Sequence, residues 1–394
     1  MKKGGTGFTP KVKPMSQKCK KKKDVKIEKV IDFGKQLFAT VLRSRKGALT
    51  ELSRLLRFQK GTKGFHREYE RLLPLIGQLQ EAYKQCVLAA FQNKGLRLGI
   101  IDDTNIKKTG QYFPHEKVQH DHATNYFFSG MKVISSAVYQ YGKVATISSR
   151  IVKEDDNKLL LARDDNKLLL ARDDNKLLLA RDDVDLLIDD YFVDLFLFDS
   201  WYCKSPLLEK IRWGEKIFIS RLRTDSSVKQ EGKRCVPLNA LLQKIPHKDY
   251  TLIKIKGKSY WIYEATLNFK TYGSLRVIAS KEGAHKNPVF FTTNTDKFIP
   301  KFIVKLYLKR FSIEVFFKDA KQFLNFETFL CRNAQKWDAH LLLTNVVHWA
   351  IQKKNSISKT VRKIQENISE CLFFLNENLS IKKFFDELRK KCQT

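Results

Sequence analysis

Four polar side chains between Tyr307 and Lys321 have the chemical types that act on phosphate esters, and their spacing predicts one helix face. At about 100° per residue, Tyr307, Arg310, Glu314 and Lys321 fall within an arc of about 60° around a helix axis. Apolar residues occupy the neighbouring arc, which a core would take. A carboxylate flanked by two cations and a phenol suits a metal ion and a phosphate. For this helix taken alone, a solvated face with i,i+4 ion pairs is the alternative interpretation.

Further carboxylates lie upstream, at the ends of two apolar runs that predict buried strands. Asp102 and Asp103 end the run that begins at Leu98, and Asp199 ends a second run. Active sites of open α/β sheets lie at such strand ends, so two strands can deliver Asp102 and Asp199 to one edge. A single aspartate that closes a strand is more often a turn former. Together with Glu314, these aspartates offer the carboxylates for one site.

These carboxylates offer only oxygen ligands, which suit Mg²⁺ or Mn²⁺ rather than zinc. Two such ions about 4 Å apart would clamp one scissile phosphate. Asp102 and Asp103 are adjacent, and neighbouring residues of a strand point to opposite faces, so only one of them can be a good ligand. The metal-ligand set is therefore Asp199 and Glu314 with either Asp102 or Asp103.

The spacing Tyr-x-x-Arg-x-x-x-Glu-x6-Lys resembles the signature of a large group of bacterial insertion-sequence transposases of the DDE type. The resemblance implies an α/β fold: an RNase H-like mixed sheet flanked by helices, with a β-rich insertion and helical N- and C-terminal regions. It implies Asp102 rather than Asp103 as the first catalytic acid, because relatives place that acid directly after the strand. Asp103 stays open as the alternative.

The resemblance also implies an activity and partners. The expected reaction is metal-dependent cleavage at the ends of a transposon followed by strand transfer, with no covalent protein intermediate. Tyr307, Arg310 and Lys321 would contact the DNA, and Trp261 would hold a flipped base, although packing in a sheet is the alternative for Trp261. The expected partners are the double-stranded terminal inverted repeats and target DNA, bound by a homodimer in the synaptic complex.

Composition and periodicity divide the chain into regions. We expect a basic tail at 1–29, a helical DNA-binding domain at 30–95, the first part of the RNase H-like core at 96–205, a β-rich insertion at 206–296, the second part of the core at 297–330, and a helical basic region at 331–394. Within the core, Tyr141 and Gly142 separate two β-rich runs and predict a hairpin turn. Within the first helical region, the runs 30–43, 49–58 and 69–92 have helical periodicity.

A tandem repeat interrupts the first part of the core. Asp-Asp-Asn-Lys-Leu-Leu-Leu-Ala-Arg occurs at 155–163, 164–172 and 173–181, and Asp182-Asp183 begin a degenerate fourth copy, so the repeat region is 155–183. Nine residues advance a helix by about 900°, which puts successive leucine triplets half a turn out of phase. We therefore expect the extra copies to loop out or fold back as an in-frame expansion, rather than to form a solenoid or a heptad zipper.

The charge balance indicates a polyanionic partner. The chain has 74 Lys and Arg against 42 Asp and Glu, a formal net charge of +32, and its first 23 residues hold nine lysines and no acid. Such a surplus predicts phosphate-backbone binding with a steep salt dependence. No apolar run approaches 18 residues and none follows the basic start, so we expect a cytoplasmic, nucleoid-associated protein that does not enter membranes.

Other chemistry is disfavoured, and two alternative functions remain. Seven scattered cysteines without a Cys-x-x-Cys pair argue against a zinc site and a disulfide scaffold. The cluster of His115, His120 and His122 suits a structural or DNA-facing role better than a metal site. The alternatives to an active transposase are a catalytically impaired DNA-binding remnant, suggested by the repeat inside the core, and an RNase H-like nuclease without strand transfer.

Overall fold

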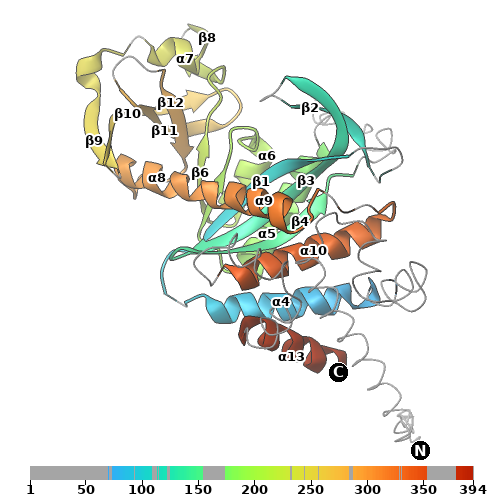
Figure 1. The fold of residues 1–394 in the computed structure, drawn as a ribbon. Helices are drawn as coiled ribbons and strands as arrows, with labels where there is room; N and C mark the ends of the chain where they lie inside the picture. Colours follow the sequence, from blue (N-terminus) through green and yellow to red (C-terminus); the bar gives the residue numbers. More distant parts are fainter. Residues whose placement is uncertain are drawn as a thin grey trace, which may run out of the picture.

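The computed structural model describes residues 70, 73–92, 94–108, 113, 115–121, 125–153, 174–230, 233–243, 245–255, 257–283, 287–327, 329, 331–352 and 379–393. The expected helices at 30–43 and 49–58, the first two nonapeptide copies and His122 lie outside these residues. The helix expected at 69–92 is present as a short 3-10 turn, η1 (Leu73–Leu75), followed by α4 (Ile76–Ala90). Figure 1 shows the elements in chain order.

Five strands form the centre of one mixed sheet. They are β1 (Leu98–Lys107), β3 (Tyr126–Gln140), β4 (Lys143–Ile151), β5 (Leu195–Phe198) and β6 (Ile217–Arg221). Their order is β4-β3-β1-β5-β6; β3 is antiparallel to its neighbours, and β1, β5 and β6 are parallel. Three antiparallel strands followed by two parallel ones is the RNase H-like arrangement, so the expected fold class is confirmed.

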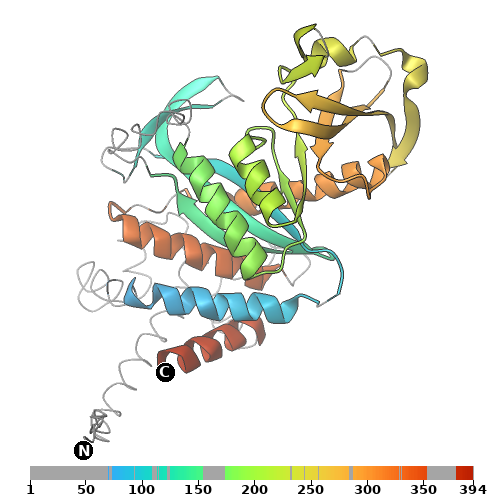
Figure 2. The ribbon, with the colours of Figure 1, turned by 180° about the vertical axis from the view of Figure 1, so that it is seen from behind.

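The parallel strands are buried because helices cover both faces of the sheet. All four residues of β5 are buried, as are the first five of β1. Viewed from behind, α5 (Asp174–Asp189) and α6 (Ser205–Trp213) cover one face (Figure 2). The other face carries α8 (Pro300–Tyr307), the 3-10 turn η4 (Leu308–Arg310) and α9 (Phe311–Phe323) (Figure 1).

The turn between β3 and β4 is the one expected from the sequence. Tyr141 and Gly142 both have positive φ, 48° and 84°. Two central residues with positive φ define a type I′ turn, whose twist matches that of the paired strands. The hairpin fixes the register of β3, which in turn pairs with β1 along its whole length, from Leu98 to Lys107.

Below the edge strand β4 lies a helical layer. It consists of α4, α10 (Ala334–Ile351) and α13 (Leu379–Gln393), and α10 packs on β4 while α13 packs on α4 (Figure 1). Every residue of α10 from Ala339 to Ala350 is buried, as its position between β4 and α4 requires. None of the helices in the described ranges is both long enough and apolar enough to cross a bilayer.

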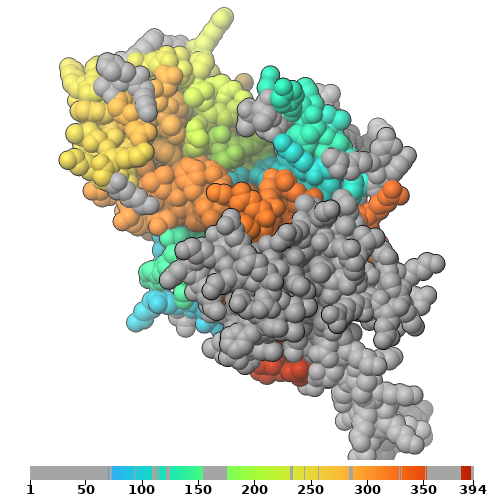
Figure 3. Space-filling model, viewed as in Figure 1, coloured from blue at the N-terminus to red at the C-terminus, as the bar shows by residue number. Residues whose placement is uncertain are grey.

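The β-rich segment between Asp199 and Glu314 continues the central sheet. It contains β7 (Ser227–Gln230), β8 (Lys233–Pro237), α7 (Leu238–Leu242), η3 (His247–Asp249), β9 (Thr251–Ile255), β10 (Lys258–Phe269), β11 (Gly273–Lys281) and β12 (Val289–Thr293). Its last strand, β12, pairs antiparallel with β6. This insertion and the ribbon of β3 with β2 (Lys117–Asp121) lie on opposite sides above α8 and α9 (Figure 3).

Candidate active site

Parallel pairing brings two of the expected acids to one edge of the sheet. The last pair in register between β1 and β5 is Ile101 with Phe198. Asp102 is the next residue of β1, which continues past the expected end to Lys107 in its pairing with β3, and Asp199 is the residue that follows β5. The two acids therefore lie side by side where the parallel pairing of β1 and β5 ends. The proximity is also electrostatic, because each of these carboxylates lies close enough to influence the pKa of Tyr202, which packs beside them.

Asp102 is the most enclosed of the three acids. It is 8% exposed, and its Oδ1 accepts a hydrogen bond of 2.9 Å from the backbone N–H of Asp103. Burial raises the pKa of Asp102 to about 7, with Asp199 and Asp103 adding to the rise and Arg310 opposing it. A carboxyl with this pKa gains from a nearby cation, because a cation offsets both the lost hydration and the repulsion of neighbouring carboxylates.

Asp199 is half-buried and is held by the backbone that follows it. Its Oδ1 accepts hydrogen bonds from the N–H groups of Trp201, at 2.9 Å, and Tyr202, at 3.3 Å. Its main-chain oxygen accepts a bond of 3.1 Å from the hydroxyl of Ser220 on β6. The turn after β5 therefore fixes both the backbone and one carboxylate oxygen of Asp199.

Glu314 reaches the first acid through Arg310. The guanidinium of Arg310 donates from Nη1 to Asp102 and from Nη2 to Glu314, so it bridges the two carboxylates. Glu314 lies in the first turn of α9, and its side chain is 44% exposed, whereas Arg310 is buried. Arg310 lies in the 3-10 turn η4 rather than in a regular α-helix, so the predicted single helix is interrupted there.

The other two residues of the stripe lie on either side of this bridge. Tyr307 is buried at the end of α8, with its ring against Phe291 at 4.9 Å and the guanidinium of Arg310 at 5.7 Å; burial raises the pKa of Tyr307 to about 12. The ammonium of Lys321 donates to the main-chain oxygen of Asn105, at 2.7 Å, and pairs with Glu327 at 3.1 Å. Lys321 thus ties α9 to the part of β1 that follows Asp102 and Asp103.

Asp103 has a different set of partners from Asp102. Its Oδ1 accepts a hydrogen bond of 2.9 Å from the hydroxyl of Tyr202 and an ion pair from Lys176, and Lys132 lies 3.9 Å from its Oδ2. Lys176 is buried, which lowers its pKa, while Asp103 opposes that shift. Sequence reasoning missed Lys176 because it is one of three identical repeat lysines. Its place in the last copy, next to the unique sequence that follows the repeats, is the signal that could have distinguished it.

Two other groups singled out from the sequence do not join this edge. Trp261 lies on β10 of the insertion, where its ring packs against His247 at 4.2 Å. His115 has positive φ in the loop before β2, and His120 bonds to Asn125 at 3.0 Å and packs on Phe127. A role for Trp261 in DNA binding stays a prediction.

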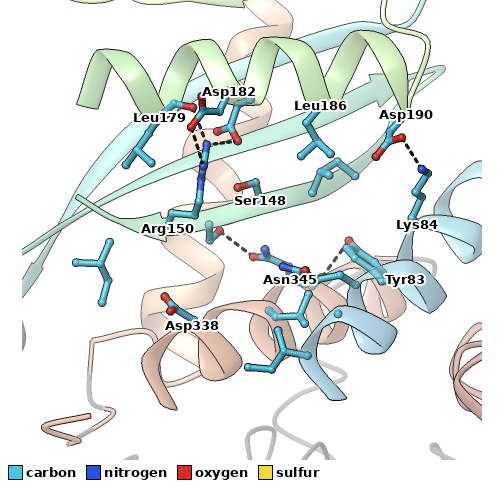
Figure 4. Close-up of a pocket in the computed structure, with 18 of the residues that line it drawn as sticks. Tyr83, Lys84, Ser148, Arg150, Leu179, Asp182, Leu186, Asp190, Asp338 and Asn345 are labelled. Atoms are coloured by element: carbon cyan, nitrogen blue, oxygen red, sulfur yellow. Dashed lines mark hydrogen bonds and ion pairs between the residues drawn. The ribbon is translucent and has the colours of Figure 1, made fainter. Parts of the chain in front are cut away.

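A cavity lies elsewhere, between α4, β4, α5 and α10 (Figure 4). Two ion pairs lie in its lining: Arg150 bonds to Asp183 at 2.7 Å, and Lys84 to Asp190 at 2.5 Å. Asp102, Asp199 and Glu314 are not among its lining residues. The cavity therefore lies at the junction of the helical layer with the sheet, apart from the three carboxylates.

The donor set at the sheet edge fits a hard divalent cation in chemistry. All three acids supply carboxylate oxygens, the ligands that Mg²⁺ and Mn²⁺ prefer. Within the part of the chain that the structure describes, no three His, Cys, Asp or Glu side chains are gathered closely enough to hold a metal ion. Asp102 and Glu314 are kept apart by the guanidinium of Arg310, which lies between the two carboxylates and bonds to both.

Comparison with known families agrees with this arrangement. A family model described as the transposase DDE domain matches residues 93–349, well over half of the chain. The chain belongs to the DDE transposase family. The match of this transposase extends from just before β1 to the last turns of α10, so it includes Asp102, Asp199 and Glu314 together with the insertion. A comparison with curated proteins found no match.

Proposed function

We propose that this transposase cuts DNA at the ends of its own element and joins the freed ends to target DNA, with Asp102, Asp199 and Glu314 as its catalytic carboxylates. The observation that carries the proposal is the meeting of Asp102 and Asp199 where the parallel pairing of β1 and β5 ends, with Glu314 linked to Asp102 through Arg310. Asp103 is the weaker candidate for the first acid, because Lys176 and Tyr202 already engage its Oδ1.

The three carboxylates would hold two Mg²⁺ or Mn²⁺ ions once Arg310 moves from between Asp102 and Glu314. When bound, such ions activate the attacking oxygen and stabilise the leaving 3′ oxygen of a scissile phosphate. Arg310 is buried beside this position and offers a planar fork of donors that suits a phosphate as well as a carboxylate. Its displaced guanidinium would hold a phosphate next to the cut.

The remaining site residues would orient the DNA. Tyr307 and Lys321 flank the bridge and would contact the sugar-phosphate backbone, which positions a duplex without reading its sequence. Trp261 would act from the insertion, where an aromatic ring can stack on an unpaired base. The bound DNA would be the terminal inverted repeats and a target duplex, held by a homodimer in the synaptic complex.

Replacement of Glu314 by glutamine tests the proposal. Glu314→Gln keeps the size of the side chain and removes the charge that a metal requires. We expect cleavage of a duplex carrying the element's end to fall by about a thousandfold or more, because several kcal/mol of transition-state stabilisation are lost. Binding of the same duplex, measured by gel shift, should persist.

Matched variants make the outcome specific. Glu209→Gln changes an exposed glutamate on α6 and should cleave as the unchanged protein does. Asp102→Asn should abolish cleavage, whereas Asp103→Asn should leave measurable activity. Unchanged cleavage by Glu314→Gln would remove the assignment. Binding without any cleavage by the unchanged protein would favour the impaired remnant, and cleavage without joining would favour the nuclease.

A further inference from the structure

Lys176 lies between the groups that support both catalytic aspartates. It comes from the first turn of α5 and is 7% exposed. Its ammonium pairs with Asp103, whose backbone N–H donates to Asp102 at 2.9 Å. One side chain thus contacts the residue that holds the first acid.

The same ammonium also contacts the support of the second acid. It lies 3.6 Å from the ring centroid of Trp201 and 4.5 Å from that of Tyr202. The backbone N–H groups of these two residues hold the carboxylate of Asp199. A cation over two aromatic rings is attracted by both, and burial strengthens that attraction. The hydroxyl of Tyr202 closes the network by donating to Asp103.

We propose that Lys176 is a positioning residue for the transposase reaction: through Asp103, Trp201 and Tyr202 it fixes the carboxylates of Asp102 and Asp199 relative to each other. The last nonapeptide copy, 173–181, is then a working part of the active site, because it supplies Lys176. This inference rests on the proposed function of the two aspartates. Supporting groups of this kind usually change metal affinity or activity by about 10- to 100-fold when removed.

Lys176→Met tests the inference, because it keeps most of the length of the side chain and removes the charge. In the full chain, we expect kcat for cleavage of an end duplex to fall about 10- to 100-fold, with KM for the DNA little changed. Affinity for Mn²⁺ alone, measured by electron paramagnetic resonance, should weaken in step. If Lys176 only held α5 on the sheet, its loss would lower the melting temperature without lowering kcat selectively over KM.

Lys210→Met is the matched control. Lys210 lies on α6 and pairs at 2.7 Å with Asp185, which lies on α5, the helix that also carries Lys176. This ion pair does not involve Asp102, Asp103 or Asp199. Its loss should leave kcat and Mn²⁺ affinity near those of the unchanged protein. If Lys176→Met behaves like Lys210→Met in both measurements, the inference is wrong.

A second variant covers the case in which Lys176→Met does not fold. Tyr202→Phe removes only the hydroxyl that donates to Asp103, and it should lower kcat and Mn²⁺ affinity in the same direction by a smaller factor. Unchanged values in Tyr202→Phe would then overturn the inference. Failure of the proposed function looks different: the unchanged protein would not cleave at all, and the Mn²⁺ affinities of the same variants would still decide the role of Lys176.

Discussion

Asp102 and Asp103 are neighbours in the chain, yet the fold gives them different chemical surroundings. Asp102 meets Arg310 from the face covered by α8 and α9, and Asp103 meets Lys176 from the face covered by α5 and α6. Tyr202 also donates to Asp103. Opposite side-chain directions on a strand explain the difference. A metal ion that takes Asp102 must replace Arg310, and one that takes Asp103 must replace Lys176, so a buried ion pair is broken in either case. Asp102 is favoured because Arg310 also holds Glu314, so one displacement frees two carboxylates.

The buried side chain of His340 makes the free energy of unfolding sensitive to acid. His340 on α10 stacks on Phe329 at 4.1 Å, and its Nε2 lies 3.2 Å from the main-chain oxygen of Asn325, to which it must donate. Burial lowers the pKa of His340 to about 3; the bond to Asn325 opposes the shift and Lys108 adds to it. The unfolded chain, with a histidine pKa of about 6.5, therefore binds this proton first as the pH falls.

This titration predicts a loss of stability in acid. Between about pH 6.5 and pH 3 the unfolded state binds more protons at this site, so the free energy of unfolding falls as the pH falls. From pH 8 to pH 5 the contribution of His340 should drop by roughly 2 kcal/mol. His340→Gln keeps an N–H donor and should lose less over this range, measured by urea unfolding at both pH values.

The comparison must be between the two proteins, because other groups act in the opposite direction. Burial raises the pKa of Asp102 to about 7 and that of Asp183 to about 6, so their folded forms bind protons more readily and gain stability as the pH falls. These terms are shared by His340→Gln and cancel in the difference. Equal pH dependence in the two proteins would show that His340 does not titrate in this way.

The number of repeat copies could change the helical phase of α5, the helix that contains the last copy. In the described part of the chain, α5 begins at Asp174, within the last copy, and continues to Asp189. The buried residues Val184 and Leu187 of α5 come after the repeats in the chain. Any array that ends in this same copy therefore leaves Val184 and Leu187 at the same angle around the helix axis relative to that copy. Because the copies are identical, removal of 155–172 leaves one copy next to Val184, with the counterpart of Lys176 in place.

Deletion of one copy or of two should therefore give equivalent proteins. We expect both shortened chains to melt within about 2 °C of the full chain, which corresponds to less than about 2 kcal/mol for a chain of this size. Both should cleave DNA at least as well as the full chain. A loss confined to the chain with two copies would indicate instead that the copies form one continuous helix with α5, since nine residues change its phase by half a turn.

The elements also show what the sequence could reveal and what it could not. Apolar runs that end in acids predicted β1 and β5, and helical spacing predicted the segment with Glu314, because these patterns are local. Within the expected β-rich insertion, β7 and β8 are short and alternate only weakly, so the sequence pattern does not mark them as separate strands. The pairing of β12 with β6 depends on contacts between distant segments. So does the inward turn of Arg310, which faces a carboxylate 208 residues away.

The charge surplus of the chain predicts that the protein binds the phosphate backbone of DNA before any cleavage. A net charge of +32 cannot be neutralised within the chain, and each phosphate contact releases counterions from a duplex. We expect the affinity of Glu314→Gln for a duplex of unrelated sequence to fall with salt. The slope of log K against log salt should be steeper than about −5, which corresponds to six or more phosphate contacts.

The nine lysines at the start of the chain allow this surplus to be divided. Removal of residues 1–23 should make the salt slope shallower by about 0.9 for each phosphate contact that the tail provides. Cleavage by the shortened protein at low salt should persist, because the carboxylates and their supports all lie within residues 93–349. A slope near −1 in the Glu314→Gln protein would mean that the basic residues do not face DNA. An unchanged slope after truncation would place the phosphate contacts on the rest of the chain, whose surplus of Lys and Arg over acids stays large without the tail.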